Sequence, residues 1–365
     1  MSSAGTLAAP GSALAGASSL EPVDRLADLR SEWSALALES RNVFSSFEFL
    51  ATWWEHFGGD RPLRAGVLRD GEGRARVILP LYLWRRRPLR VLRFLGNGAG
   101  DVLGPVCAPG LRSEAGQALE RLLDEAPWAW DVFVGERLNA EAGYRERVGG
   151  VLLRREGYPL LRADGDFEHF LAARSSNFRR QARARRRRLE RDHRVRFRVT
   201  ADAAHLDADL DTLFRLHAER WGGDSSFGGP RTAFHRAFAH AAFDRGWLRL
   251  RILELDGRPV AATYGFRFAG VESVFQSGRD PRLEHESLGL VMLTEAVRGA
   301  LDDGIREFRL LRGHSPYKYR FATEDGGLEN IAVAAGRRGG AALGALQAVS
   351  GCSPARRLLQ GPLDL

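Results

Sequence analysis

Apolar residues follow helix-like and strand-like spacing in turn along the first half of the chain. Within 22–38, the residues Leu26, Leu29, Trp33 and Leu36 fall on one helical face. Further helices are expected over 44–57 and 111–125, and strands over 63–68, 76–84, 88–95 and 128–134. This order predicts a mixed α/β lobe.

The second half contains the same kinds of segment in a similar order. Helices are expected over 167–192, 203–221, 231–245 and 287–301, and strands over 195–199, 247–255, 259–268, 271–277 and 307–311. The pairs Asp256-Gly257 and Ala269-Gly270 separate three of these strands and predict tight turns. Two halves of similar order favour a duplicated α/β (α+β) fold with mixed central sheets flanked by helices. The two lobes would span 22–155 and 156–335.

The two ends of the chain have a different composition from the lobes. Residues 1–21 are rich in alanine, serine and glycine, and no basic residue precedes Arg25, so a disordered tail is expected rather than a signal peptide. Residues 336–365 are rich in glycine, alanine and arginine and are expected to form a flexible tail. No apolar stretch is long enough to span a membrane, and we expect a cytoplasmic protein.

Cysteine and charge narrow the function further. Cys107 and Cys352 provide neither a disulfide framework nor metal-ligand spacing, so no metal is expected. The net charge of +8 is concentrated in 174–198, where twelve arginines face only Glu190 and Asp192. The rest of the chain is close to neutral, and the basic character belongs to this one segment.

The arginine-rich helix, Arg179–Arg191, has two interpretations that remain open. Phe178, Ala182 and Leu189 form a narrow apolar stripe within it, which is typical of a solvated helix that packs by one face. Alternatively, its arginines bind an anionic partner such as tRNA, a lipid pyrophosphate or a membrane surface. Aromatic residues do not alternate with the arginines, which argues against readout of a nucleic-acid sequence.

Lys318 is the one lysine among 54 basic residues, and it lies in the aromatic segment 315–321 just after a predicted strand. An arginine keeps its proton under nearly all conditions, whereas the pKa of a lysine changes readily with burial. A lysine in this place is therefore a candidate for chemistry rather than for surface charge.

Several motifs of the second half resemble one known family. They are the segments 255–262, 275–280, 287–290, Gly313 and Tyr317-Lys318. With three antiparallel strands followed by a helix and a further strand, they resemble the BioF-like (CelD-type) acetyltransferases of the GNAT superfamily. That family is linked to cellulose and exopolysaccharide synthesis and is related to the Fem-type peptidoglycan aminoacyltransferases. The resemblance covers 165–330 well and 33–105 more loosely.

The resemblance implies a tandem GNAT acyltransferase fold and transfer of an acetyl group from acetyl-CoA to an amine of a sugar or peptide precursor. The implied donor-binding residues are Gln276, Ser277, Gly278, Ser287, Leu288, Gly289 and Leu290. A helix that begins near Ser287 would also, on physical grounds, offer free N–H groups to a pyrophosphate. Tyr317 would protonate the leaving thiolate, and Lys318 would support the reacting carbonyl or the acceptor.

Three further residues are candidates on the acceptor side. His314 could act as a general base, although Glu286 or water could do the same, and a single histidine is more often structural. Trp221 and Asp224 are expected near the acceptor, in the cleft between the lobes.

One motif departs from the family pattern. The usual pyrophosphate signature is Gln/Arg-x-x-Gly-x-Gly/Ala, and the best match here is Glu284-x-x-Ser287-x-Gly289. The donor therefore remains open between acyl-CoA and aminoacyl-tRNA, and a non-catalytic GNAT-like binding protein is the third alternative.

Overall fold

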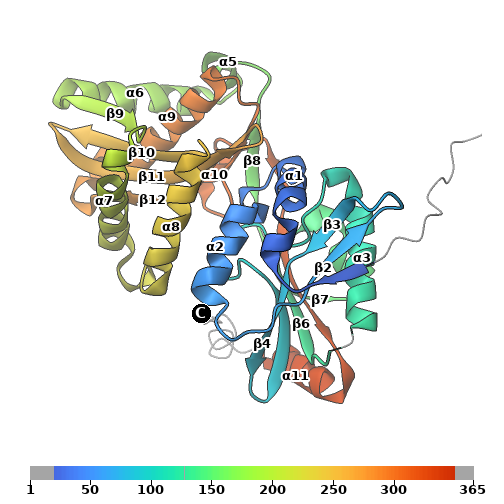
Figure 1. Ribbon diagram of the computed structural model, residues 1–365. Helices are drawn as coiled ribbons and strands as arrows, with labels where there is room; N and C mark the ends of the chain where they lie inside the picture. Colours follow the sequence, from blue (N-terminus) through green and yellow to red (C-terminus); the bar gives the residue numbers. More distant parts are fainter. Residues whose placement is uncertain (1–19, 127, 350–365) are drawn as a thin grey trace, which may run out of the picture.

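The structure is a computed structural model that describes residues 20–126 and 128–349 (Figure 1). It has two lobes, each built on its own sheets, and this confirms the predicted α/β fold with mixed sheets flanked by helices. In Figure 1 the C-terminal lobe lies at the upper left and the N-terminal lobe at the lower right.

The N-terminal lobe contains two sheets. The first has the order β1 (Leu20–Val23), β2 (Ala65–Arg69) and β3 (Ala75–Leu79). The second has the order β4 (Leu81–Arg86), β5 (Leu89–Phe94), β6 (Val132–Asn139), β15 (Leu328–Ala334) and β7 (Val151–Glu156). The α-helices are α1 (Arg30–Ser40), α2 (Phe47–Phe57), α3 (Arg112–Glu125) and α4 (Tyr144–Arg147). Short 3-10 helices are η1 (Leu26–Leu29), η2 (Val43–Ser45), η3 (Pro109–Leu111) and η4 (Ala140–Ala142).

The C-terminal lobe is built on one seven-stranded sheet. Its order is β14 (Glu324–Asp325), β8 (Pro159–Arg162), β13 (Glu307–Arg309), β12 (Val271–Arg279), β11 (Arg258–Phe268), β10 (Leu248–Leu255) and β9 (Val195–Val199). The α-helices are α5 (Phe167–Ala172), α6 (Ser176–Asp192), α7 (Ala203–Trp221), α8 (Pro230–Asp244), α9 (Leu288–Asp302) and α10 (Pro316–Tyr319). The 3-10 helix η5 (Gly222–Asp224) follows α7, and the 3-10 helix η6 (Pro281–Glu286) precedes α9.

Two predicted hairpins order the centre of this sheet. Asp256 and Gly257 have φ of 54° and 81°, and Ala269 and Gly270 have φ of 48° and 74°. Positive φ at both central residues is the geometry of the two-residue turn that suits the twist of paired strands. β10, β11 and β12 therefore form an antiparallel meander, as the sequence predicts.

The two faces of the seven-stranded sheet are covered by different helices. Ile252 and Tyr264 are buried on the face that packs against α7 and α8. Val260 and Ala261 pack with Val291 of α9 on the opposite face. The apolar stripe predicted for the arginine-rich helix is confirmed, because Phe178, Ala182 and Leu189 of α6 are buried. The expected single helix over 167–192 is interrupted between α5 and α6, where Ser175 caps the new helix by accepting the N–H of Phe178.

The end of the described chain returns to the N-terminal lobe. β15, expected in the lobe 156–335, lies between β6 and β7 in the N-terminal sheet. The prediction of a flexible tail from residue 336 is wrong for Gly336–Val349, which form helix α11 against β15 (Figure 1). Gly339 allows this packing, since a Cβ there would lie 1.9 Å from the carbonyl oxygen of Asp131. Residues 350–365, with Cys352, lie outside the described residues.

The expected N-terminal tail is only partly covered by the structure. Leu20 and Glu21, which were assigned to the tail, belong to β1 and pair with Leu68 and Val67 of β2. Residues 1–19 lie outside the described residues. Within the described ranges, no helix is both long and apolar enough to cross a membrane, and no group of three or more histidine, cysteine, aspartate or glutamate residues is arranged to hold a metal ion.

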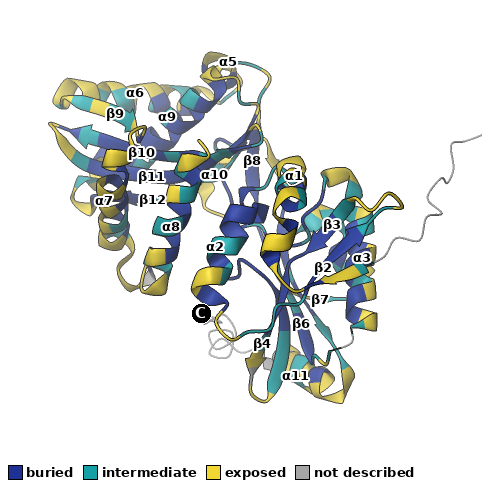
Figure 2. Cartoon of the chain, in the orientation of Figure 1, coloured by how far each residue is buried: buried dark blue, intermediate teal, exposed yellow. Residues whose placement is uncertain are grey.

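The lobes share a continuous apolar core at their contact. Helix α2 packs on α8, where the ring of Phe49 lies 5.4 Å from that of Phe234 and 4.9 Å from that of Phe238. At the rim, Arg245 donates to Glu48 at 2.7 Å. Figure 2 shows α2 buried where it faces the C-terminal lobe, whereas the outer surfaces of α6 and α7 are exposed.

Candidate active site

The candidate site begins where two parallel strands separate. β12 pairs with β13 only over Val271–Ser273, although it continues to Arg279. A bulge at Phe275 bends the same stretch, because Tyr264 pairs with Gln276 and Gly265 with Val274. On its β13 side, β12 beyond Ser273 therefore has no partner strand among the described residues, and its free backbone groups can bind a ligand. This unpaired strand edge is called the gap below.

Helix α9 begins on one side of this gap. Ser287 precedes it in the left-handed conformation, with φ of 56°, and its side chain does not cap the helix. The first N–H groups of the helix have no intrahelical partner and are not capped by this side chain. The guanidinium of Arg279 lies 3.2 Å from the position of a Cβ on Gly289. A helix N-terminus and an arginine together favour an anion.

Arg220, near the end of α7, reaches the free edge of the same strand. Its Nη1 donates to the Ser277 hydroxyl at 3.0 Å and to the Ser277 carbonyl at 3.3 Å. Its guanidinium also lies 4.6 Å from the ring centre of Trp221. Burial, with Arg279 nearby, lowers the pKa of Arg220, and no carboxylate of the described residues pairs with it. Two arginines therefore flank the end of β12.

Tyr317 of α10 lies beside these arginines. Burial raises its pKa, and the positive charges of Arg220 and Arg279 offset this only in part. The side chain is nevertheless 41% exposed. A phenol that stays protonated at neutral pH and reaches solvent can donate a proton.

Gln276 points to the other face of the sheet from α9. Its Oε1 accepts from His217 Nε2 at 3.2 Å, and His217 Nδ1 lies 2.9 Å from the Ser225 hydroxyl. Burial lowers the pKa of His217 to about 4, so the ring is neutral at pH 7. The side chain of Gln276 thus belongs to the α7 side, although the sequence groups it with the donor residues near α9.

Three other predicted donor residues contribute mainly to packing: two by their side chains and one, a glycine, by having none. Leu288 is buried, and Leu290 packs partly buried against the core around α5 and α6. Gly278 permits close approach of β12 to α7, because a Cβ there would lie 2.4 Å from the backbone nitrogen of His217. Only their backbone groups can contact a donor.

Lys318 binds the main chain rather than an acidic group. Its Nζ donates to the carbonyl of Arg312 at 2.6 Å and to that of Leu311 at 3.3 Å. Leu311 has a positive φ of 57°, and the chain turns away from β13 there. Burial lowers the pKa of Lys318 to about 8. The lysine therefore fixes the segment that borders the gap next to Tyr317.

The remaining predicted residues lie apart from β12. His314 accepts the N–H of Gly157 at 2.8 Å and contacts the hydroxyl of Tyr319 at 3.3 Å, so both ring nitrogens have partners in the connection between the lobes. Trp221 is 47% exposed at the end of α7, and Asp224 ends the short helix η5. The predicted place of the acceptor beside Trp221 remains a prediction.

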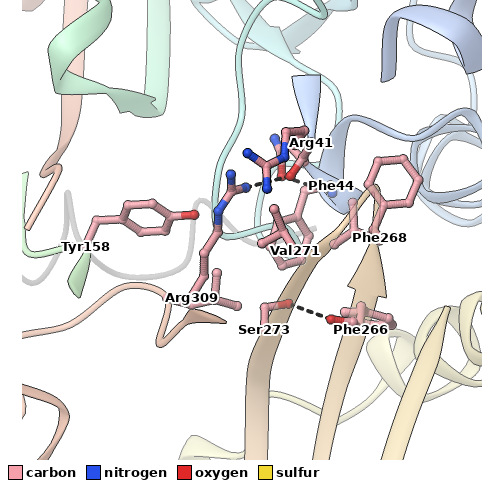
Figure 3. A pocket seen from close by; sticks show the side chains of 11 residues that line it. Arg41, Phe44, Tyr158, Phe266, Phe268, Val271, Ser273 and Arg309 are labelled. Carbon is pink, nitrogen blue, oxygen red and sulfur yellow. Dashed lines mark hydrogen bonds between the residues drawn. The ribbon is translucent and has the colours of Figure 1, made fainter. Parts of the chain in front are cut away.

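Small cavities lie between the lobes, away from Tyr317. One encloses about 10 Å³ beside Phe44 and Ser273 (Figure 3), where Arg309 donates to the carbonyl of Arg41 at 2.7 Å. A neighbouring cavity of about 110 Å³ is lined by Tyr158, Arg309 and other residues of both lobes. Trp221 is not among the described residues that line them.

Sequence reasoning missed Arg220, Arg279 and Ser225 as parts of the site. The signal was present, because Arg279 lies in the 275–280 motif and Arg220 directly precedes Trp221. Their meaning depends on the separation of β12 from β13, which the pattern of apolar residues does not reveal.

Comparison with known proteins supports the fold assigned from these features. Residues 176–319 match the family described as Acetyltransferase (GNAT) domain. No curated protein matches the chain in a sequence comparison.

Solved structures of similar fold extend over both lobes. FemX is 10% identical, with a TM-score of 0.59 over 84% of this chain and 96% of FemX. The C-terminal domain (DUF2156) of a putative lysylphosphatidylglycerol synthetase from Agrobacterium fabrum is 11% identical, with a TM-score of 0.56 over 89% and 97%. L-PGS from Bacillus licheniformis is 12% identical, with a TM-score of 0.54 over 88% and 95%. At these identities the likeness concerns the fold alone.

Proposed function

We propose that this protein is an N-acyltransferase that moves an acetyl group from acetyl-CoA to an amine of a sugar or peptide precursor. The observation that carries the proposal is the gap beside β12, with the start of α9 on one side and Tyr317 on the other. The GNAT match over 176–319 supports acyl transfer as the reaction class.

The donor would bind along the free edge of β12. Its pyrophosphate would lie at the N–H groups of Leu288 and Gly289, with Arg279 and Arg220 supplying positive charge. The missing glycine of the usual signature is consistent with this arrangement, because Ser287 already adopts the left-handed conformation.

The chemistry needs one bond formed and one broken. The amine nitrogen attacks the thioester carbonyl, and backbone N–H groups of β12 near Gln276 stabilise the oxyanion. The carbon–sulfur bond then breaks, the thiolate takes a proton from Tyr317, and the excess proton of the amine passes to water. Lys318 acts by holding the segment that carries Tyr317.

Calorimetric titration with acetyl-CoA tests the donor. We expect binding to the wild type and a loss of at least about 100-fold in Gly289→Glu, because a carboxylate replaces the space for an anion at the helix start. Ser113→Glu is the matched control, since Ser113 is the second residue of α3 as Gly289 is of α9, and it should bind normally. Absence of binding to the wild type contradicts the proposal.

The acceptor is the second part of the test. Amino sugars and peptides with a free amino group should be acetylated, as expected for a cytoplasmic step of exopolysaccharide or cell-envelope synthesis. Mass spectrometry of the products identifies the acceptor class. Binding of acetyl-CoA without transfer to any amine favours a non-catalytic GNAT-like binding protein.

Aminoacyl-tRNA is the second candidate donor, and α6 is the observation that favours it. Arg180, Arg187 and Arg191 are exposed along one side of this helix. Replacement of Arg180 and Arg187 by glutamine should then weaken tRNA binding and reduce its salt dependence by about one charge each. Arg186→Gln is the matched control, because Arg186 is already bound to Glu295 at 2.7 Å. Salt-independent binding would exclude tRNA.

A further inference from the structure

The two faces of β12 offer different chemistry at its free edge. Arg279 meets the start of α9 on one face, while Gln276 and Gly278 meet α7 on the other. Because neighbouring side chains of a strand point to opposite faces, Ser277 shares the α9 side with Arg279. If the anionic donor occupies the α9 side, the acceptor must reach the carbonyl from the α7 side.

On the α7 side, Gln276 has a free amide group. Its Oε1 faces Nε2 of His217, and an amide oxygen can only accept, so Nε2 carries the ring proton. The Nε2 group of Gln276 then points away from the ring, and no hydrogen bond of the described residues uses it. The residue is half-buried, so this N–H₂ group can reach a ligand in the gap.

His217 is held in turn by Ser225. With the ring proton on Nε2, Nδ1 accepts from the Ser225 hydroxyl at 2.9 Å. The Ser225 oxygen also accepts the N–H of Phe227 at 3.3 Å, which fixes the direction of its own proton. Both His217 and Ser225 are buried, at 2% and 9% exposure. The chain of bonds Ser225–His217–Gln276 thus has one direction.

Aromatic packing keeps this chain rigid. The ring of Phe227 lies 4.8 Å from that of His217, and Phe227 is itself packed against the buried rings of His235 and Tyr264. Such a network costs free energy to build from polar groups, and a glutamine on a strand would otherwise rotate freely. A half-buried glutamine with so much buried support fits a binding role.

We propose that Gln276 binds the acceptor, and that His217 and Ser225 are positioning residues that aim its amide into the gap. The inference rests on the proposed acyl transfer and names the acceptor side of that same site. The amide donates two N–H groups, so the acceptor class is an amine with a hydroxyl, carbonyl or carboxylate oxygen next to the nitrogen. An amino sugar meets this description, whereas a simple alkylamine does not.

The first test needs no substrate. In protein labelled with ¹⁵N-histidine, His217 should give a neutral ring with its proton on Nε2 and slow exchange of that proton. The slow exchange should persist in Gln276→Glu, which keeps an acceptor oxygen, and disappear in Gln276→Ala. A ring protonated on Nδ1, or an unchanged signal in Gln276→Ala, overturns the relay whatever the donor is.

The second test measures transfer from acetyl-CoA to glucosamine, with ethylamine as the comparison. Gln276→Ala should raise KM for glucosamine at least about tenfold, as expected for a lost hydrogen bond to substrate. It should leave the affinity for acetyl-CoA and the KM for ethylamine within twofold of the wild type. An unchanged KM for glucosamine overturns the inference. Absence of transfer to either amine, although acetyl-CoA binds, counts against the proposed function instead. In that case the histidine spectrum decides whether the hydrogen-bond relay exists.

A double-mutant comparison of Ser225 and Gln276 distinguishes a positioning role of Ser225 from a merely structural one. Ser225→Ala should raise KM for glucosamine about threefold in the wild-type background and have no effect on top of Gln276→Ala. Ser225→Thr, which keeps the hydroxyl, should restore the wild-type value. Ser273→Ala is the matched control, because Ser273 is a buried serine on the strand of Gln276 and its hydroxyl donates to the carbonyl of Phe266. Equal effects of Ser225→Ala in both backgrounds would show a merely structural role.

Discussion

Each lobe contains one short parallel strand pair joined through a helix, and the two pairs end differently. In the C-terminal lobe, β12 pairs with β13 over Val271–Ser273 and then continues alone to Arg279. In the N-terminal lobe, β5 pairs with β6 over Val91–Arg93 and stops at Phe94. Among the described residues, the first strand of the pair thus continues well beyond its parallel partner only in the C-terminal lobe.

The chain after β5 fills the corresponding space in the N-terminal lobe. Trp53 Nε1 donates to the carbonyl of Asn97 at 2.9 Å and holds the glycine-rich turn. Leu103 then donates to the carbonyl of Arg137 on β6 at 3.2 Å, and the Arg137 guanidinium binds the carbonyl of Gly100. A loop occupies the place where the other lobe has a gap. The fold thus provides a place for a ligand in each lobe, and in the N-terminal lobe a packed loop fills that place.

The largest effect is expected from Gly278→Ala. A Cβ at this position would lie 2.4 Å from a backbone atom of α7, and backbone cannot move aside as a side chain can. We expect a fall of at least about 100-fold in turnover, since small displacements of reacting groups are costly, together with a lower Tm. Gly299→Ala, in open space on α9, should leave turnover unchanged and raise helix stability slightly. Equal turnover in the two variants would contradict the prediction.

Acid should destabilise the C-terminal lobe more than the N-terminal lobe. Burial lowers the pKa of His217 to about 4 and that of His235 to about 3. Between pH 6.5 and about 4 the unfolded chain binds protons that the folded chain does not, so the free energy of unfolding falls as the pH falls. The N-terminal lobe contributes only His56 over 20–156, exposed on α2.

Urea unfolding of His235→Leu checks this asymmetry. The difference in unfolding free energy between the variant and the wild type should be about 3 kcal/mol more favourable to the variant at pH 4.5 than at pH 7, because pH 4.5 is two units below the ordinary histidine pKa of 6.5. The buried Nδ1 of His235 has no partner among the described residues, so the ring can be replaced without breaking a bond. An identical difference at both pH values would refute the assignment.

Trp53→Phe tests the filled space of the N-terminal lobe. The variant loses the bond to the Asn97 carbonyl and leaves a buried acceptor, at a cost of about 2 kcal/mol in unfolding free energy. Acetyl-CoA affinity should not change, because the bonds of Asn97, Gly100 and Leu103 described above are made within the N-terminal lobe. A large loss of affinity would show that the two lobes share the donor site.

The smallest effect is expected from Lys318→Arg, at about tenfold in turnover, or 1.4 kcal/mol. The planar guanidinium keeps the charge but is too large to replace the ammonium between the carbonyls of Leu311 and Arg312. Steady-state turnover and Tm should be measured together, and an unchanged turnover would assign Lys318 to fold maintenance alone.

The sequence predicted local structure well because local structure follows local pattern. The hairpin at Asp256-Gly257 and the buried stripe of α6 depend on neighbours in the chain, and both are confirmed. The sequence could not show that β15 crosses to the other lobe, because its apolar pattern suits any sheet. Gly336–Val349 were assigned to a tail since glycine is a poor helix former, yet packing on β15 outweighs that preference.

The candidate site shows the same limit. The motifs pointed to Ser287, Gly289 and Tyr317, and the structure places their elements around the gap. They did not distinguish the two faces of β12, which separate Gln276 from Arg279. They also suggested His314 for catalysis, whereas its ring nitrogens bind Gly157 and Tyr319. Sequence spacing identifies residues, but the direction of a side chain needs the register of the sheet.

The return of the chain to the N-terminal lobe has a consequence for biosynthesis. β15 is an interior strand of the sheet whose first strand in the chain is β4. It lies between β6 and β7, which do not pair with each other. The first lobe therefore cannot complete its sheet until β15 has left the ribosome, and the second lobe can finish its own sheet earlier. Order of synthesis and order of sheet completion are therefore reversed between the lobes, because β14, the last strand of the C-terminal sheet, precedes β15 in the chain.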